Sequence, residues 1–172
     1  PMGCINTIFN DNYTNCAGVD VSSVYRVVKL CSDTKAPRML RFLTNLLEPK
    51  GKLIVSNQTL VLQALDTKED ALVLYTDEKG RSELEQLINA RDQDKNPRGK
   101  LMYHIEVIKL LALATKEKHT ENQKWIHARL SLTQLAECLR TIMGCQEKAY
   151  RLEAAYIQLL CDAFVNSTRR SF

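Results

Sequence analysis

The chain has few helix-breaking residues and no stretch apolar enough to cross a bilayer. Its 172 residues include only six glycines and four prolines, and 45% of the residues are hydrophobic, a composition typical of an ordered domain. The most apolar stretch, residues 100–116, contains His104, Glu106 and Lys109, and this stretch is too short and too charged to span a membrane. We therefore expect a soluble domain that makes no membrane contact.

The sequence also lacks the short motifs of catalytic and metal-binding sites. It contains no glycine-rich phosphate loop, no G-x-S-x-G and no H-E-x-x-H. His104 and His127 have no Cys, Asp or Glu three or four residues away on one helix face, and His119 lies in a polar stretch. We interpret these histidines as structural. The sequence predicts no catalytic, cofactor-binding or metal-binding residue, it identifies no ligand-binding residue, and we expect no enzyme.

The cysteines lack the spacing of a zinc site, and no C-x-x-C pair occurs. Their even number is compatible with three disulfides. Two of them fall on or beside apolar helix faces, which favours buried free thiols in a reducing compartment. The six are Cys4, Cys16, Cys31, Cys138, Cys145 and Cys161.

Charge of one sign is not in large excess, since 24 basic and 20 acidic residues leave a net charge of +4. This balance gives no reason to expect nucleic acid or an anionic membrane as the main partner. Lys35, Arg38 and Arg41, with Lys50 and Lys52 beyond them, could form a strip that holds phosphate. Because no aromatic residues are interleaved, we interpret the strip as the solvated face of a helix.

Apolar residues recur at helical spacing in about eight segments, and no convincing pair of strands occurs. Asp20 is a plausible N-cap, Pro37 suits a first helical position, and Ser131 with Gln134 has the spacing of a capping box. The apolar run 71–75 fits either a strand or a buried helical turn, and we favour helix because partner strands are lacking. The predicted helices are 5–9, 20–31, 37–47, 56–75, 82–91, 100–116, 131–143 and 146–165.

Residues 100–116 are expected to form the central helix, because their apolar side chains point in nearly every direction around the helix axis. Only Glu106 and Lys109, three residues apart, clearly need water. The turn signal at 96–99 fixes the start of this helix, and the polar residues 116–124 are expected to be a solvated connection.

Pairs of predicted helices recur at roughly forty residues, which is the period of armadillo and HEAT arrays. We therefore expect an all-α fold, an armadillo/HEAT-like α-solenoid of about eight helices. Residues 1–172 are expected to form a single helical domain. Because Pro1-Met2-Gly3 does not resemble a natural start, we interpret this domain as an internal fragment of a much larger chain.

Four stretches resemble the inositol trisphosphate receptors, in their central helical region related to ryanodine receptors. They occur in the same order as in that family, and the second and third are the most specific. Those are E-D-A-L-V-L-Y-T-D at 69–77, and L-M-Y-H-I at 101–105 with L-L-A at 110–112. The first is L-R-F-L at 40–43 with G-K-L-I at 51–54, and the fourth is A-Y-I at 155–157. At 110–118 the chain departs from the family's usual L-L-A-V-C-T-E-G-K, which indicates a divergent member.

The resemblance implies a cytosolic helical segment of an intracellular ligand-gated calcium-release channel of the endoplasmic reticulum. Such a segment transmits ligand binding upstream to the pore, and its partners are other domains of the channel and the neighbouring subunits of a tetramer. In that family the residues that hold the inositol phosphate lie earlier in the chain, so no ligand residue is carried over.

The alternative is a free-standing armadillo-like adaptor that binds a peptide in a groove. Trp125 or Tyr156 would then be candidates for an anchoring side chain, although aromatic residues at such positions are more often part of the core.

Overall fold

The computed structural model describes residue 9 and residues 12–90, 95–117 and 119–166. Nine α-helices and no β-strand occur in these residues, so the expected all-α class is confirmed. The first predicted helix, 5–9, and Cys4 lie outside the described residues, apart from Phe9. The helices are α2 (Tyr13–Ala17), α3 (Val21–Thr34), α4 (Pro37–Leu47), α5 (Val55–Asp66), α6 (Glu78–Asn89), α7 (Lys95–Thr115), α8 (Thr120–His127), α9 (Leu132–Gly144) and α10 (Tyr150–Leu160).

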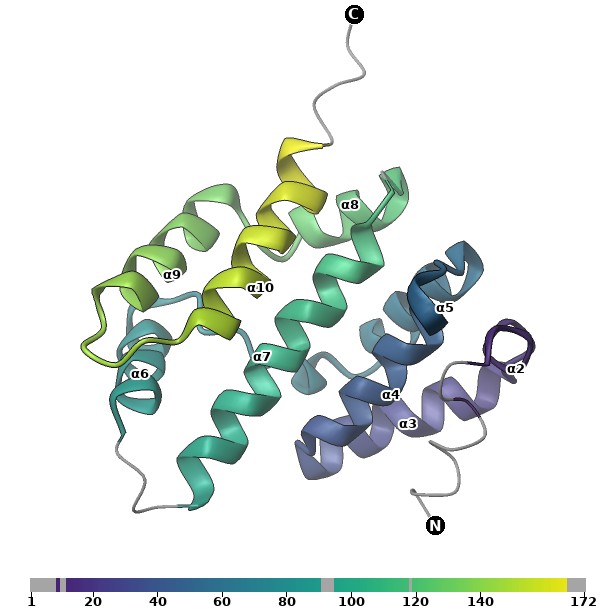
Figure 1. Cartoon of the computed structure of the whole chain (residues 1–172), viewed down its shortest axis with the longest axis horizontal. Helices are drawn as coiled ribbons and strands as arrows, with labels where there is room; N and C mark the ends of the chain where they lie inside the picture. The colour runs from purple at the N-terminus through teal and green to yellow at the C-terminus, as the bar shows by residue number, and fades with distance from the viewer. Residues whose placement is uncertain (1–8, 10–11, 91–94, 118, 167–172) are drawn as a thin grey trace, which may run out of the picture.

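Helix α7 is the centre of the molecule, as the sequence predicts. It runs between α4 and α10 (Figure 1) and also contacts α5, α6 and α8. Side chains on all sides of its middle turns are buried, including Tyr103, Val107, Ile108 and Leu110. Across the described residues, α7 included, no helix combines the length and apolar character that a bilayer crossing requires.

Three predicted helix starts occur as expected. A carboxylate oxygen of Asp20 accepts a hydrogen bond from the amide of Ser23 at 3.1 Å, which caps α3. Pro37 is the first residue of α4. Ser131 and Gln134 form a reciprocal capping box at the start of α9.

Two helices begin earlier than predicted. α7 begins at Lys95 rather than at residue 100, because a proline in the first turn of a helix removes no intrahelical hydrogen bond and Pro97 is therefore tolerated. α6 begins at Glu78 rather than at residue 82, since Asp77 accepts a hydrogen bond from the amide of Gly80 at 2.7 Å and caps it.

The prediction that 116–124 is a solvated connection is wrong, because α8 begins at Thr120. The buried face of this helix is polar and therefore does not show as an apolar repeat. Asn122 donates to the carbonyl of Ala114 at 2.8 Å, and Gln123 donates to the carbonyl of Asp162 at 2.8 Å. Both side chains thus exchange water for backbone carbonyls as their hydrogen-bond partners.

The prediction that the helix continues through 71–75 is also wrong. A single 3₁₀ turn, Glu69–Ala71, is followed by non-helical backbone from Leu72 to Thr76, with Leu72 itself extended. Tyr75 is buried, whereas Leu72, Val73 and Leu74 are half-buried. We refer to residues 71–75, which run from the last residue of this turn to Tyr75, as the extended run; it has no partner strand among the described residues.

Cys31, Cys138 and Cys145 are buried free thiols, and Cys161 is a half-buried one. Burial raises the pKa of Cys31 to about 12 and also raises the pKa of Cys138 and Cys145. For Cys31 and Cys138, the expectation of buried free thiols is thus confirmed over the alternative of disulfides.

Candidate functional site

The carbonyls of the extended run 71–75 are bound by side chains instead of by a neighbouring strand. The hydroxyl of Tyr103 donates to the carbonyl of Ala71 at 2.7 Å and shares its proton with the carbonyl of Cys31 at 3.2 Å. The thiol of Cys138 donates to the carbonyl of Tyr75 at 3.2 Å. Side chains from α7 and α9 thus satisfy backbone groups that cannot reach water.

His104 provides the third of these contacts. Its Nδ1 lies 2.8 Å from the carbonyl oxygen of Val73, and its Nε2 lies 3.0 Å from the hydroxyl of Tyr156 on α10. A carbonyl can only accept, so Nδ1 carries the proton and Nε2 accepts from Tyr156. Complete burial lowers the pKa of His104 to about 4, and the ring is therefore neutral at physiological pH.

These contacts connect the stretches that resemble the inositol trisphosphate receptors. Tyr103 and His104 belong to the L-M-Y-H-I stretch, and they bind carbonyls of Ala71 and Val73 in the 69–77 stretch. Tyr156, which binds His104, belongs to the fourth stretch. Three of the four stretches that carry the resemblance therefore form one hydrogen-bonded network in the core.

The other two histidines also make contacts within the fold. Nδ1 of His119 caps α8 by accepting from the amide of Asn122 at 3.4 Å. Nε2 of His127 lies 2.8 Å from the carbonyl oxygen of Ala163, and its ring stacks on Phe164 at 4.4 Å between centroids. In the part of the chain that the structure describes, no three His, Cys, Asp or Glu side chains gather as metal ligands.

Glu106 is not solvated, contrary to the prediction, because its side chain is only 4% exposed. One of its carboxylate oxygens lies 3.8 Å from Nε of Arg41 on α4 and 3.8 Å from Nη2 of Arg151 on α10. Two guanidinium groups from neighbouring helices thus lie over one buried carboxylate, which compensates the cost of burying its charge.

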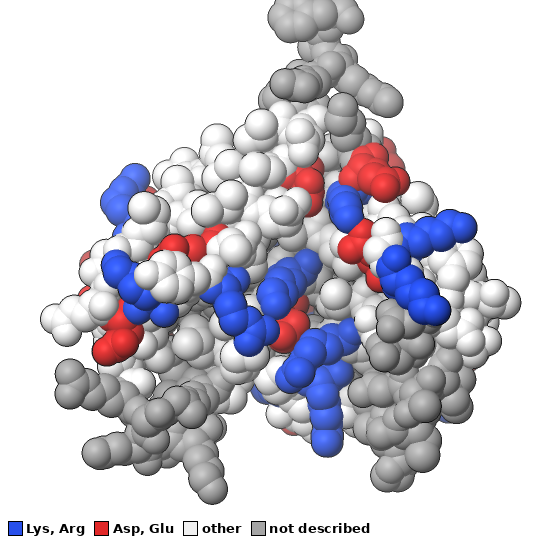
Figure 2. All heavy atoms as spheres, in the orientation of Figure 1, with Lys and Arg blue, Asp and Glu red and all other residues white. Residues whose placement is uncertain are grey.

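A cleft lies beside the carboxyl-terminal half of α7. This cleft of about 400 Å³ between α4, α7 and α10 is lined by Thr44, Glu48, Lys109, Lys116, Gln158 and Asp162, together with apolar side chains. Lys116 forms an ion pair with Glu48. Figure 2 shows Lys and Arg side chains gathered over the middle of the face in view. We call the surface formed by Arg41, Lys109 and Arg151 the basic groove.

The basic residues that the sequence suggests as one strip lie in different environments in the structure. Lys35 donates to the carbonyl of Asp70 at 2.6 Å, and Lys52 lies 4.3 Å from the ring centroid of Tyr13. Arg38 is exposed on α4, one turn before Arg41, and Lys50 is exposed in the turn that follows α4.

The true neighbours of Arg41 come from α7 and α10, and sequence reasoning did not associate them with it. Arg151 shares the carboxylate of Glu106 with Arg41, and Lys109 lies one turn beyond Glu106 on α7. These residues belong to helices far apart in the chain, so no local spacing relates them.

The two aromatic residues considered as peptide anchors already make contacts within the fold. Tyr156 is 1% exposed and therefore inaccessible to a partner. Trp125 is partly buried and donates to a carboxylate oxygen of Asp66 at 3.2 Å. The guanidinium of Arg129 lies 3.9 Å from the Trp125 ring centroid, which forms a cation–π contact.

Comparison with known proteins gives a distant relationship. No protein-family model matches the chain. The inositol 1,4,5-trisphosphate receptor itr-1 of Caenorhabditis elegans is 23% identical over 172 aligned positions, which cover 96% of this chain and 6% of the receptor. The chain thus spans a small part of that relative's length, and its similarity to the inositol trisphosphate receptor family is distant but extends over nearly all of its residues.

Proposed function

We propose that this chain is a cytosolic helical coupling segment of an intracellular ligand-gated calcium-release channel of the inositol trisphosphate receptor type, at the endoplasmic reticulum membrane. The observation that carries the proposal is the contact between the two most specific stretches of the resemblance. Tyr103 and His104 bind the carbonyls of Ala71 and Val73. The polar side chains of Tyr103 and His104, both part of the resemblance, make specific hydrogen bonds in the core, which apolar periodicity alone does not explain.

Within such a channel, the segment would be part of an armadillo/HEAT-like α-solenoid. Two features support this arrangement: the consecutive helices α3 and α4 contact each other, as do α9 and α10, and both α4 and α10 pack on α7. The partners of the segment would be other domains of the same chain and the neighbouring subunits of a tetramer.

The buried network suggests how the segment would transmit a change. Helix α7 is connected to the extended run 71–75 by Tyr103 and His104, and to α10 by the bond from Tyr156 to His104. Helix α4 packs on α7, so a displacement of α4 would be passed to α7 by packing and from α7 to α10 by the bond between Tyr156 and His104. Packed elements respond in this way as rigid bodies, so ligand binding upstream would reach the pore as a shift of helices.

The size and location of the natural protein provide the first test. An antibody raised against this chain is used on fractionated source cells. A band far above 19.6 kDa in the membrane fraction is expected. A band near that size in the soluble fraction would overturn the channel proposal and leave the adaptor.

Coupling is tested in the full-length protein with Tyr103→Phe, which removes one hydroxyl from the network. Ligand binding to membranes that contain the variant is expected to be unchanged, whereas ligand-induced calcium release falls. Tyr150→Phe on the exposed start of α10 is the matched control and should leave both quantities unchanged. Normal release in the Tyr103→Phe variant would contradict a role of the network in coupling.

A further inference from the structure

We infer that the basic groove binds an acidic segment of a protein partner, with the partner's carboxylates on Arg41, Arg151 and Lys109 and an apolar side chain in the pocket at the start of α10. This inference rests on the charges and shape of the groove and does not depend on the channel proposal.

The first argument is an excess of positive charge over the buried carboxylate. Glu106 supplies one negative charge to two guanidinium groups, and Lys109 lies one turn further along α7. The side chains of Arg41 and Arg151 are 60% and 63% exposed. The arginines are thus anchored at the protein surface by Glu106 while their charge remains available to an incoming anion.

The second argument is the geometry of the ion pairs. Both arginine nitrogens lie 3.8 Å from the same oxygen of Glu106, beyond the 2.7–2.9 Å typical of a charge-assisted hydrogen bond. A guanidinium group has five N–H donors, so each arginine retains donors for a further carboxylate. Because one arginine comes from α4 and the other from α10, they can bind two carboxylates on opposite sides of the groove.

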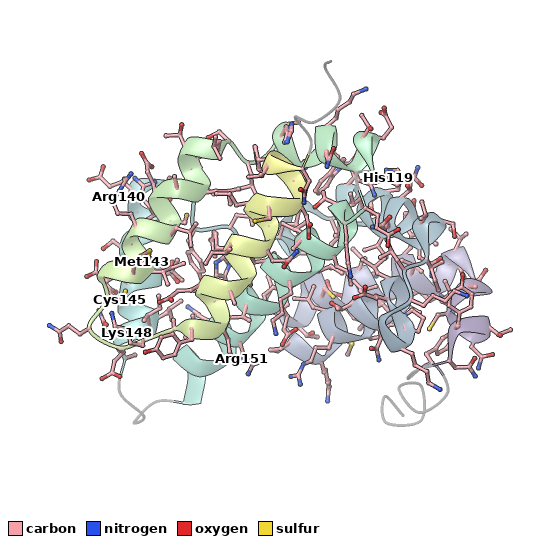
Figure 3. All side chains as sticks on the ribbon, turned by 45° about the horizontal axis from the view of Figure 1, so that its top comes forward. His119, Arg140, Met143, Cys145, Lys148 and Arg151 are labelled. Atoms are coloured by element: carbon pink, nitrogen blue, oxygen red, sulfur yellow. The ribbon has the colours of Figure 1, made fainter. Side chains whose placement is uncertain are left out.

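The third argument is an apolar pocket beside the arginines. A pocket of about 240 Å³ lies between α6, α7 and the start of α10, lined by Ile88, Leu101, Ile105, Leu152, Lys148 and Arg151, among others. Its apolar lining suits an aliphatic side chain, and two cations lie among the lining residues. Figure 3 shows Arg151 at the first turn of α10 and Lys148 in the loop before it.

These features form one line along α7. Leu101 and Ile105 line the apolar pocket, Glu106 lies under the arginines, and Lys109 and Lys116 line the cleft beyond. At about 1.5 Å per helical residue, the line from 101 to 116 is about 22 Å long. This length matches about seven residues of extended peptide, whereas a free anion would use only one part of it.

The groove also favours an acidic protein segment over nucleic acid. Its far end is lined by the carboxylates of Glu48 and Asp162, which would repel a continuous phosphate backbone. An acidic segment avoids this repulsion, because its carboxylates need to lie only on Arg41, Arg151 and Lys109 and the residue at the far end can be uncharged. The apolar pocket accommodates an aliphatic side chain, which a nucleic acid does not provide. Alternating acidic and apolar side chains match both parts of the surface.

The inference is tested by fluorescence anisotropy with the 172-residue chain and a labelled eight-residue peptide of four glutamates, three serines and one leucine. The same peptide with glutamines in place of glutamates is the matched probe. The acidic peptide is expected to bind at 50 mM NaCl and more weakly at 200 mM, because exposed charges are screened. The glutamine peptide should bind at least about tenfold more weakly, which corresponds to about 1.4 kcal/mol.

Variants of the chain locate the site. Arg41→Gln and Arg151→Gln are each expected to weaken binding of the acidic peptide about fivefold. Arg140→Gln, an exposed arginine on α9 (Figure 3), should not change it. Glu106→Gln is expected to tighten binding, because it removes the carboxylate that competes for both arginines. A gain in affinity cannot result from partial unfolding, so this variant distinguishes a binding site from a structural ion pair.

Several outcomes would overturn the inference. Equal binding of the acidic and glutamine peptides, or no response to the two arginine substitutions, would exclude an acidic segment at this groove. Displacement of the peptide by low-millimolar inorganic phosphate would assign the site to a free anion, and tighter binding of a single-stranded DNA of twelve nucleotides would assign it to nucleic acid. Each of these results leaves the channel proposal unchanged, because that proposal is tested by the immunoblot.

Discussion

The hydroxyl of Tyr156 donates a hydrogen bond to Nε2 of His104 at 3.0 Å, inside the core. The opposite ring nitrogen donates to the carbonyl of Val73. One neutral imidazole in a single tautomer therefore connects α10 to the extended run 71–75 through α7. The protonated ring would lose its acceptor for Tyr156, so the connection depends on pH.

Stability is predicted to fall as the pH is lowered from about 6.5 to about 4. Burial lowers the pKa of His104 from 6.5 to about 4, so the unfolded chain binds more protons than the folded chain between these values. Stability therefore rises with pH in this window and is lost as pH falls through it. At about 1.4 kcal/mol per pKa unit the loss from this residue is about 3 kcal/mol, measured by urea unfolding at several pH values.

His104→Gln isolates this contribution. The variant is expected to be less stable at pH 7 but to lose about 3 kcal/mol less than the wild-type chain between pH 6.5 and pH 4. The pKa of Asp20 and that of Asp70 are each lowered chiefly by a hydrogen bond from a serine, and these carboxylates titrate alike in both chains. Equal pH dependence of the two chains would contradict a buried neutral His104.

Tyr103→Phe is predicted to destabilise the chain by about 1–3 kcal/mol, because it leaves the carbonyls of Ala71 and Cys31 without the hydroxyl that binds them. Tyr150→Phe makes the same chemical change at a side chain that is 71% exposed and should change stability by less than about 0.5 kcal/mol. Thermal unfolding of both variants measures the difference. Equal melting temperatures would argue against the Tyr103 contacts.

Ile108→Asp is predicted to unfold the chain. Ile108 is fully buried in α7, and an unpaired charge there costs several kcal/mol, a large part of a domain's stability of roughly 5–15 kcal/mol. Arg38→Ala on the exposed side of α4 is expected to fold normally. Circular dichroism and gel filtration distinguish the two results. A cooperatively folding Ile108→Asp chain would contradict the central position of α7.

The described cysteines are predicted to differ in their reactivity towards N-ethylmaleimide. Cys161 is half-buried, whereas burial raises the pKa of Cys31 to about 12 and also raises the pKa of Cys138. Since the thiolate is the reactive form, labelling of Cys161 at pH 8 should be at least about tenfold faster. Mass spectrometry of peptides from the native chain measures the rates, and similar rates would indicate that the core opens readily.

Gly80→Ala is predicted to destabilise the start of α6 by about 1–3 kcal/mol. A Cβ atom there would lie 2.6 Å from Oδ1 of Asp77 and 3.0 Å from Cα of Tyr75, so either the helix cap or the extended run would have to shift. Gly144→Ala is the matched control, since a Cβ atom at Gly144 meets no atom of the described residues within 4 Å. It should be neutral or stabilise the chain by up to about 1 kcal/mol. Equal melting temperatures of the two variants would contradict this close approach.

Features that depend on local sequence could be predicted. Asp20 caps α3 and Ser131 caps α9 because a capping side chain needs only its own first turn. The central position of α7 follows from apolar side chains around its whole circumference, which no exposed helix would have. The free state of Cys31 and Cys138 follows similarly from their place on apolar faces.

Features that depend on distant partners could not be predicted. In the sequence Glu106 looks like a solvated residue, because the two arginines that lie over its carboxylate, Arg41 and Arg151, belong to other helices. The run 71–75 was expected to be helical because it lacks partner strands, but side chains such as Tyr103 bind its carbonyls instead. Helix α8 was missed because Asn122 buries an amide rather than an apolar group. For Glu106 and for the run 71–75, the determining interactions join residues that lie far apart in the sequence.

The central position of α7 also determines the order in which the chain can fold during its synthesis. Helices α3, α4 and α5 leave the ribosome before α7 has been made, so the apolar residues Leu40 and Leu43 of α4, which are buried in the folded chain, emerge without their main partner. A nascent chain in this state exposes apolar surface and is prone to aggregate. The amino-terminal helices thus complete their packing only after the residues of α7 have been added to the chain.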